Sequence, residues 1–368
     1  MQEIKMVDLH GQYLRIKDEI DATIQKVLNS TAFINGPEVK EFNADLARYL
    51  NVKHVIGCAN GTDALQIALM ALDLHPGDEV ISPDFTFIAT VEVISLLKLK
   101  PVIVDVDPDT FTINIEQVKK AITPKTKAII PVHLYGLCAN MSELIQIANE
   151  YNLAIIEDTA QALGANYNDG KISGKAGTLH SIGCTSFFPS KNLGAYGDGG
   201  AMITNNDQLA ERMRSIANHG AKVKYYHDEI GVNSRLDTLQ AAILKVKLKY
   251  LDEYASTRQK AAAYYTKRLS KIADISTPVV PDYTTHVYHQ YTIKFAGDRD
   301  ALKKYLAEKG IPTMIYYPVP MHAQKAFQAE GDFTVSNKLA KTVISLPMHT
   351  ELTEAEQDYI CSAIENFI

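Results

Sequence analysis

Two stretches, PVIVDVD at residues 101–107 and KAIIPVHLYG at residues 127–136, set the architecture of the chain. Their central runs, VIVDV and AIIPV, are apolar on both faces of an extended strand. Such a strand must be covered on both sides, which is typical of a parallel sheet that lies between two layers of helices. The two stretches therefore predict an α/β domain.

Similar runs alternate with helical patterns through the first 260 residues. The segment from Thr62 has Leu65, Leu69 and Leu72 one turn apart, and residues 207–220 repeat this pattern before a terminating glycine. We expect a mostly parallel sheet of about seven strands between helices. The other five strands are predicted at residues 54–59, 78–83, 153–158, 182–188 and 200–205.

The alternation of strands and helices ends after residues 233–254. The spacing of apolar residues there predicts one long helix that continues past Arg258 and bridges two domains. A smaller α+β region follows, and its turns are marked by prolines. With 368 residues the chain exceeds the usual ~100–200 per domain. We place a large domain at residues 1–260 and a small domain at 261–368. The small domain is expected to have strands near 289–295 and 313–318 and a final helix from 353.

Composition limits the possible partners. The formal net charge is -6, with both signs interspersed, which argues against a general nucleic-acid-binding surface. The first twenty residues are charged, and no apolar run approaches 18 residues, so we expect no membrane span and a cytoplasmic protein. Four scattered cysteines without C-x-x-C spacing predict buried free thiols and no metal site.

Residues that directly follow a strand are the first candidates for a site, because open parallel sheets bind ligands at the carboxyl ends of their strands. The first such segment is Asn60-Gly61-Thr62, between a strand and a helix. Its backbone N–H groups and its hydroxyl suit a phosphate. An ordinary helix cap by Asn60 or Thr62 is an equal alternative.

A second segment, LAIIEDTAQA, ends an apolar strand with Glu157 and Asp158. A carboxylate at that depth needs a cationic or N–H partner, since its burial alone is costly. A protonated pyridine nitrogen would serve for Asp158, and Gln161 could bond a nearby ring oxygen. The alternative is that Asp158 caps the next helix.

The third segment, SFFPSKNLGAYGDGG at residues 186–200, places Lys191 before its glycines. A phosphate-binding loop of the Walker type needs the lysine after the glycines. The order of lysine and glycines in this segment therefore excludes such a loop. A lysine that forms a Schiff base with a cofactor aldehyde fits, with Ser186 on the cofactor's phosphate. A plain surface lysine remains the alternative.

A fourth segment, GVNSRLD, puts Asn233 and Arg235 at the entry of the long helix. The guanidinium could bind a carboxylate through two hydrogen bonds. A helix cap with a surface ion pair explains the pattern equally well.

Together these segments resemble the DegT/DnrJ/EryC1/StrS family of sugar aminotransferases, which are pyridoxal-phosphate enzymes of fold type I. The resemblance extends from FINGPEVKEF near residue 33 to SLPMH near residue 349. It implies pyridoxal 5'-phosphate as cofactor, with pyridoxamine 5'-phosphate formed during turnover. It also implies a homodimer with shared active sites.

The resemblance assigns a role to each candidate residue. Lys191 is the Schiff-base lysine, Asp158 pairs with the pyridine N–H, and Gln161 contacts the ring hydroxyl. Histidine replaces the lysine in the dehydratases of the family, so Lys191 indicates transamination. The remaining roles are phosphate binding for Gly61, Thr62 and Ser186, and for Asn233 from the other subunit; ring stacking for Phe87; and carboxylate binding for Arg235.

The implied reaction moves the amino group of L-glutamate to a keto-sugar nucleotide. The motifs are most similar to those of enzymes that aminate C3 of UDP-2-acetamido-2-deoxy-3-oxo-D-glucuronate for bacterial surface polysaccharides such as O-antigen. Those enzymes have a His-Tyr pair near the uronate, where this chain has Tyr316-Tyr317, which keeps a hydroxyl but removes a possible cation. The alternative acceptor is a dTDP- or UDP-linked 3- or 4-keto-6-deoxyhexose. A non-catalytic nucleotide-binding or regulatory protein on the same fold is the alternative of another class.

Overall fold

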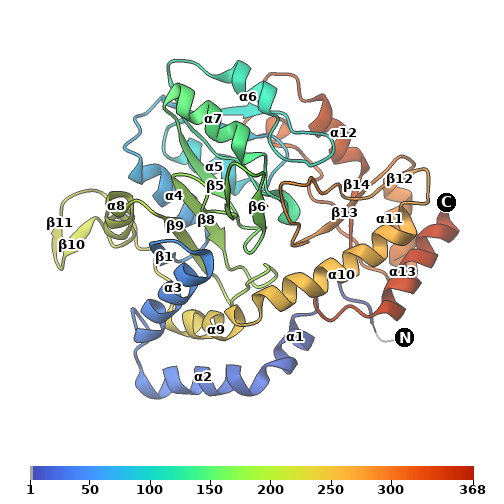
Figure 1. The fold of residues 1–368 in the computed structure, drawn as a ribbon, viewed down its shortest axis with the longest axis horizontal. Coiled ribbons are helices and arrows are strands. Elements are labelled where there is room, and N and C mark those ends of the chain that lie inside the picture. The colour runs from blue at the N-terminus through green and yellow to red at the C-terminus, as the bar shows by residue number, and fades with distance from the viewer. Residues whose placement is uncertain (1–2) are drawn as a thin grey trace.

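The computed structural model describes residues 3–368, and its centre is a seven-stranded sheet (Figure 1). The strand order is β1-β9-β8-β5-β4-β2-β3, and β9 alone runs antiparallel to its neighbours. Each predicted run of the large domain overlaps one strand. The strands are β1 (His54–Cys58), β2 (Glu79–Pro83), β3 (Lys100–Val104), β4 (Thr126–Ile129), β5 (Ala154–Asp158), β8 (Ile182–Ser186) and β9 (Gly200–Thr204).

Successive residues of the central strands pack against different helix layers. In β5, Ile156 lies in a core cluster with residues of α4 and α8, whereas Ile155 packs with residues of α7. This alternation explains why the strands are apolar on both faces. The helices of these layers are α3 (Pro37–Leu50), α4 (Gly61–Ala71), α5 (Ala89–Leu96), α6 (Ile115–Ala121), α7 (Met141–Tyr151) and α8 (Asp207–Ala217).

The single bridging helix that the sequence predicted is wrong, because two helices occupy its place: α9 (Thr238–Leu248) and α10 (Leu251–Leu269). At the break the backbone N–H of Tyr250 bonds the carbonyl of Lys247, one residue nearer than in an α-helix. Both Lys249 and Tyr250 bond Glu19 of helix α2 (Lys17–Ser30), which packs on α9. Helix α1 (Leu9–Arg15) precedes α2.

The C-terminal part of the chain forms a smaller three-stranded sheet covered by helices. Its core includes Ile293, Leu302 and Ile360, together with Ile4 from the start of the chain. The boundary predicted at residue 260 falls inside α10 and stays a prediction. The elements are β12 (Ile275–Ser276), β13 (Tyr291–Phe295), β14 (Val343–Leu346), α11 (Arg299–Glu308), α12 (Thr334–Thr342) and α13 (Glu354–Phe367).

The strand predicted at residues 313–318 is wrong. Only Met314 pairs with a strand residue, Ser345 of β14, through an isolated bridge. Pro312 and Pro318 have no N–H to extend the pairing. The third strand of this sheet is instead β14, which the sequence reading did not predict.

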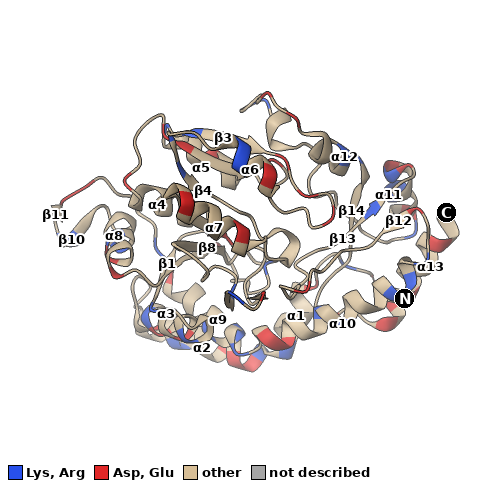
Figure 2. Cartoon of the chain, turned by 45° about the horizontal axis from the view of Figure 1, so that its top comes forward, with Lys and Arg blue, Asp and Glu red and all other residues tan. Residues whose placement is uncertain are grey.

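Two hairpins and the surface complete the molecule. Hairpin β6–β7 (Asn166–Asn168, Ser173–Lys175) lies near the sheet, whereas β10–β11 (Ala221–Val223, Tyr226–His227) projects from the body beside α8 (Figure 1). Basic and acidic positions are interspersed over the surface helices (Figure 2). No helix within residues 3–368 is long and apolar enough to cross a membrane. All four cysteines are free and buried, as predicted.

Candidate active site

A cavity of about 540 Å³ opens at the carboxyl ends of the parallel strands. The residues after β1, β2, β4, β5 and β8 meet there because these strands run in one direction. Nine of the eleven residues with a predicted catalytic, cofactor-binding or substrate-binding role line it. They are Gly61, Thr62, Phe87, Asp158, Gln161, Ser186, Lys191, Tyr316 and Tyr317.

Lys191 lies in a tight turn after β8, where its backbone N–H bonds the carbonyl of Phe188 at 2.8 Å. Its side chain forms no ion pair with any residue that the structure describes. Burial lowers the pKa of Lys191 to about 8, against the opposing influence of the Asp158 charge. At pH 7 about a tenth of the Lys191 side chains are therefore uncharged amines, far more than for a lysine of ordinary pKa, and the uncharged amine is the nucleophile.

Asp158 is the last residue of β5 and is 7% exposed. Its Oδ2 accepts a 2.8 Å hydrogen bond from Thr90 Oγ1, and its Oδ1 accepts one of 3.1 Å from the N–H of Ala160. No helix follows directly, so Asp158 does not cap one. Two donors fix the carboxylate while it retains capacity to accept a further hydrogen bond in the cavity.

Gln161 is held by both ends of its amide. Its Oε1 accepts a 2.7 Å hydrogen bond from the N–H of Tyr135, and its Nε2 donates to the hydroxyl of Tyr317 at 3.0 Å. Tyr135 adopts a left-handed backbone conformation, with φ of 57°. One hydrogen of the Gln161 amide remains free for a ligand.

The first turn of α4 forms one end of the cavity. Asn60 is the N-cap and accepts a 2.8 Å hydrogen bond from the N–H of Asp63. The N–H groups of Gly61 and Thr62 stand at the first two helical positions, which have no partner inside a helix. A Cβ on Gly61 would lie 2.7 Å from Cβ of Ser186, so only glycine allows this close approach. The helix cap by Asn60 is thus observed, and it leaves the N–H groups of Gly61 and Thr62 free for an anion.

Aromatic side chains form the wall of the cavity. Phe87 is 55% exposed, and its ring centroid lies 6.3 Å from that of Tyr317. Tyr316 lies beside Tyr317 on the segment between α11 and α12. An exposed phenylalanine at a cavity rim suits the face of a planar ligand.

Asn233 and Arg235 do not line this cavity. They precede α9, where Asn233 accepts a hydrogen bond from Arg235 and the guanidinium also bonds Asn218 Oδ1 at 3.2 Å. Within one chain these side chains are therefore bonded to each other. Their predicted roles require a second subunit.

Several positioning residues were missed by the sequence reading. Thr90 and Tyr135 hold Asp158 and Gln161, and Asp84 accepts hydrogen bonds from the N–H and Nδ1 of His322 at 2.6 and 2.8 Å. The last contact ties the segment after Tyr317 to the end of β2. Asp84 and Thr90 belong to DFTFIAT, the segment that directly follows β2, and this position is the signal that could have found them.

Glu157 is structural, although it is the neighbour of Asp158. It is fully buried, and its carboxylate accepts hydrogen bonds from three backbone N–H groups and lies 3.0 Å from Nε2 of His133. Since Nδ1 of His133 accepts from the N–H of Ala139, the Nε2 carries the proton. Glu157 thereby fixes the end of β5 on the side away from the cavity.

Comparison with known proteins identifies the family of the chain. The model of the DegT/DnrJ/EryC1/StrS aminotransferase family matches residues 14–365. The chain belongs to this family. The predicted family, its fold type I architecture and its aminotransferase class are thereby confirmed.

Three relatives show the range of the similarity. The chain is 50% identical to a pleiotropic regulatory protein of Geobacillus stearothermophilus, over 99% of this chain and 98% of the other. It is 48% identical to the UDP-2-acetamido-2-deoxy-3-oxo-D-glucuronate aminotransferase of Pseudomonas aeruginosa, over 99% and 100%. The crystal structure of NtdA from Bacillus subtilis, with bound cofactor PMP, is 36% identical, with a TM-score of 0.88 over 95% and 81% of the two chains.

The residues present fit pyridoxal phosphate. The cavity combines a buried carboxylate, an amine, a free aromatic face and the N-terminus of α4, where glycine leaves room for a phosphate. These groups correspond to the ring nitrogen, the aldehyde, the ring face and the phosphate of that cofactor.

Proposed function

We propose that the protein is a pyridoxal-phosphate aminotransferase that moves the amino group of L-glutamate to a keto-sugar nucleotide. The observation that carries the proposal is the juxtaposition of Lys191, Asp158 and the first turn of α4 in one cavity. A lone lysine or carboxylate would not indicate this chemistry. A carboxylate, a phosphate-type helix terminus and an amine of lowered pKa in one cavity indicate it.

The chain's own residues perform binding and proton transfer. When bound, pyridoxal phosphate supplies an aldehyde that attaches amines and a ring that accepts electrons from the reacting carbon. Lys191 Nζ holds the cofactor between turnovers. Once free, Nζ would be the base that takes the proton from the α carbon of L-glutamate and the acid that returns it. Its lowered pKa matches both tasks.

The remaining residues position the cofactor. Asp158, itself fixed by Thr90, would hold a proton at the ring nitrogen, and the free amide N–H of Gln161, whose other N–H bonds Tyr317, would donate to the ring hydroxyl. The N–H groups of Gly61 and Thr62, with the hydroxyl of Ser186, bind the phosphate. Phe87 stacks on the ring and excludes water from that face. After release of 2-oxoglutarate, the same residues run the sequence in reverse on the sugar.

The acceptor we propose is UDP-2-acetamido-2-deoxy-3-oxo-D-glucuronate, aminated at C3 for a surface polysaccharide. Its support is the high identity with the Pseudomonas aeruginosa enzyme over the full length of both chains. The Tyr316-Tyr317 pair favours the alternative, a 3- or 4-keto-6-deoxyhexose nucleotide, because neither side chain carries a positive charge for a uronate.

We further propose a cytoplasmic homodimer in which Asn233 and Arg235 enter the partner's cavity, Asn233 at the phosphate and Arg235 at a carboxylate. Their absence from the lining of their own chain's cavity supports this arrangement. The large and small domains, 1–260 and 261–368, would form the two sides of each site.

The central experiment uses protein purified with pyridoxal phosphate. We expect a visible absorption band that L-glutamate bleaches, with 2-oxoglutarate formed in equal amount. Lys191→Ala should abolish both, whereas Lys249→Ala, a lysine paired with Glu19 far from the cavity, should retain them. A wild-type protein that binds no cofactor would overturn the proposal and favour a regulatory role, as in the name of the Geobacillus relative. A panel of UDP- and dTDP-linked keto-sugars identifies the acceptor.

A further inference from the structure

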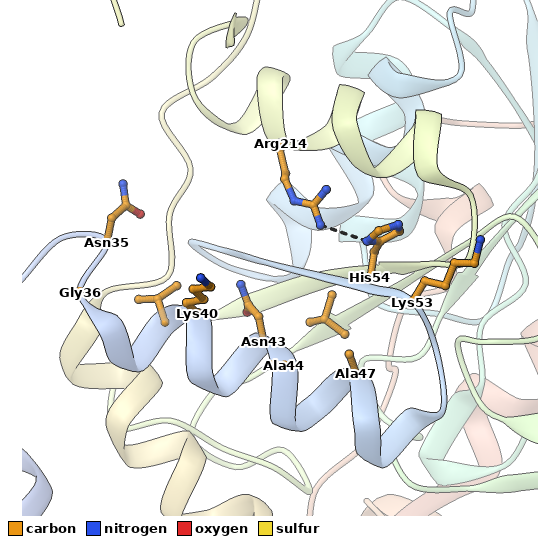
Figure 3. Close-up of a pocket in the computed structure, with 11 residues that line it drawn as sticks. Asn35, Gly36, Lys40, Asn43, Ala44, Ala47, Lys53, His54 and Arg214 are labelled. Carbon is orange, nitrogen blue, oxygen red and sulfur yellow. Dashed lines mark hydrogen bonds between the residues drawn. The ribbon is translucent and has the colours of Figure 1, made fainter. Parts of the chain in front are cut away.

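A second cavity, of about 420 Å³, lies between α3, the edge strand β1 and α8 (Figure 3). It shares no lining residue with the catalytic cavity. We call this cavity the α3–α8 groove. Polar side chains line it from α3, β1 and α8 and from the residues just before α3 and β1. They are Asn35, Lys40, Asn43, Lys53, His54 and Arg214.

The lining of the groove is basic. Lys40, Lys53 and Arg214 carry permanent positive charges, and no carboxylate lines the groove. Asp207, just outside, pairs with Lys53 at 3.4 Å. Lys40 and Arg214 form no ion pair within residues 3–368. At least two cations therefore stay uncompensated on a protein whose net charge is negative.

A hydrogen-bond chain orients one of these cations. His54 Nε2 lies 2.7 Å from Oδ1 of Asp207, and a guanidinium nitrogen of Arg214 lies 3.2 Å from His54 Nδ1, as the dashed line in Figure 3 marks. A guanidinium can only donate, so Nδ1 accepts and the imidazole proton is on Nε2, toward Asp207. Arg214 is thereby fixed at one edge while its other N–H groups remain available.

The floor of the groove adds neutral polar groups. Helix α3 begins at the groove with Gly36 as its N-cap, and no side chain caps it. Asn43, about two turns further, has an amide oxygen that is buried without a hydrogen-bond partner, so only its amide N–H groups could donate to an anion. The uncompensated cations Lys40 and Arg214 are therefore the groups of the groove that favour an anion.

We infer that the α3–α8 groove binds a pyrophosphate-type oxyanion, either free pyrophosphate or the pyrophosphate of a nucleotide. The planar fork of Arg214 suits one phosphate through two hydrogen bonds, and the lysines on α3 and before β1 suit the next. The groove is larger than a single phosphate requires. A nucleic acid would need a longer basic track than these three cations provide.

The test measures binding by calorimetry, on protein saturated with pyridoxal phosphate so that the first turn of α4 is filled. We expect saturable pyrophosphate binding that Arg214→Gln weakens about tenfold or more, since it removes a fork of charged donors. The control is Arg48→Gln, which removes an exposed arginine on α3 that pairs with Asp45 outside the groove. Thermal melting checks that both variants are folded.

UDP is the second ligand in the test. It distinguishes a groove that binds free pyrophosphate from one that binds the pyrophosphate of a nucleotide. Tighter binding of UDP that Arg214→Gln reduces identifies a nucleotide, whereas equal affinity for UDP and pyrophosphate identifies the free ion. Absence of saturable pyrophosphate binding, or equal binding by wild type and Arg214→Gln, overturns the inference. The readout needs no turnover, so it stands or fails separately from the proposed reaction.

Discussion

The hydroxyl of Thr90, on α5, donates a 2.8 Å hydrogen bond to Oδ2 of Asp158 at the end of β5. Thr90 is fully buried, and its own Oγ1 lies 3.2 Å from that of Thr86. A threonine that touches no ligand thus sets the direction of the carboxylate at the cavity. Thr90 thus orients Asp158 without lining the cavity itself, and Asp158 is the side chain that faces the cavity.

Thr90→Val should leave the fold intact and disturb Asp158. The two side chains have the same shape, but valine removes the donor, which costs about 1–2 kcal/mol of interaction with a charged group. We expect affinity for pyridoxal phosphate and the rate of reaction with glutamate to fall about tenfold. Thr90→Ser restores the hydroxyl and should recover most of both. If valine and serine behave alike, Thr90 has only a packing role.

The pKa of Lys191 predicts the pH dependence of cofactor attachment. The attacking form is the free amine, whose fraction rises as pH passes through the pKa. With burial lowering that pKa from 10.5 to about 8, the rate of attachment to the apoprotein should rise through pH 8 and level off above it. Stopped-flow absorbance measures this rate, and a midpoint near that of an ordinary lysine would contradict the expectation.

Asp158→Asn tests the direction in which the Asp158 charge shifts the pKa of Lys191. The negative charge of Asp158 raises the pKa of Lys191, in opposition to burial. Its removal should move the midpoint of attachment to lower pH. A shift to higher pH would mean that the two residues interact mainly through a path other than their charges.

Lys247 offers a test of stability. It is 1% exposed on α9, its Nζ lies over the ring of Tyr196 at 5.2 Å, and no carboxylate pairs with it in the described part of the chain. Burial, followed by the charge of Arg258, lowers its pKa to about 7. The cost of burying the charged form is therefore complete below pH 7 and disappears as pH rises to 10.5, the value when unfolded.

Lys247→Met should accordingly stabilise the protein, by about 1–3 kcal/mol below pH 7, with a gain that shrinks as pH increases. Thermal or urea unfolding at several pH values measures it. Lys245→Met, on the same helix but exposed and paired with Glu41, is the control and should change little. A loss of stability in Lys247→Met at every pH would show that the ammonium has a partner in the assembled protein.

Tyr316 is the position where acceptor choice can be changed. Tyr317 is committed to Gln161 through its hydroxyl, so Tyr316 is the free member of the pair. Tyr316→His would place a potential cation in the cavity. We expect the ratio of kcat/KM for the 3-oxo-uronate to that for a keto-6-deoxyhexose to rise about tenfold, as for a new charge-assisted hydrogen bond. An unchanged ratio would exclude this position from uronate recognition.

The sequence predicted the sheet and most of the cavity because both depend on local patterns. Strands apolar on both faces, such as the one ending at Asp158, require a parallel sheet, and polar residues after them converge at one edge. The break at Lys249 depends on contact with Glu19, more than two hundred residues away, and cannot be read from helical spacing. Tertiary hydrogen bonds, such as that of Thr90 to Asp158, leave no periodic signal either.

The placement of Asn233 predicts the outcome of mixing two inactive variants. Asn233→Ala lacks the proposed phosphate contact, and Lys191→Ala lacks the nucleophile. If Asn233 acts in the partner's cavity, a mixed dimer contains one site with both residues intact and one with neither. Random exchange makes half of the dimers mixed, so activity should recover to about a quarter of the wild-type value. If Asn233 acts within its own chain, no site in the mixture is complete, and activity stays at the level of the parents.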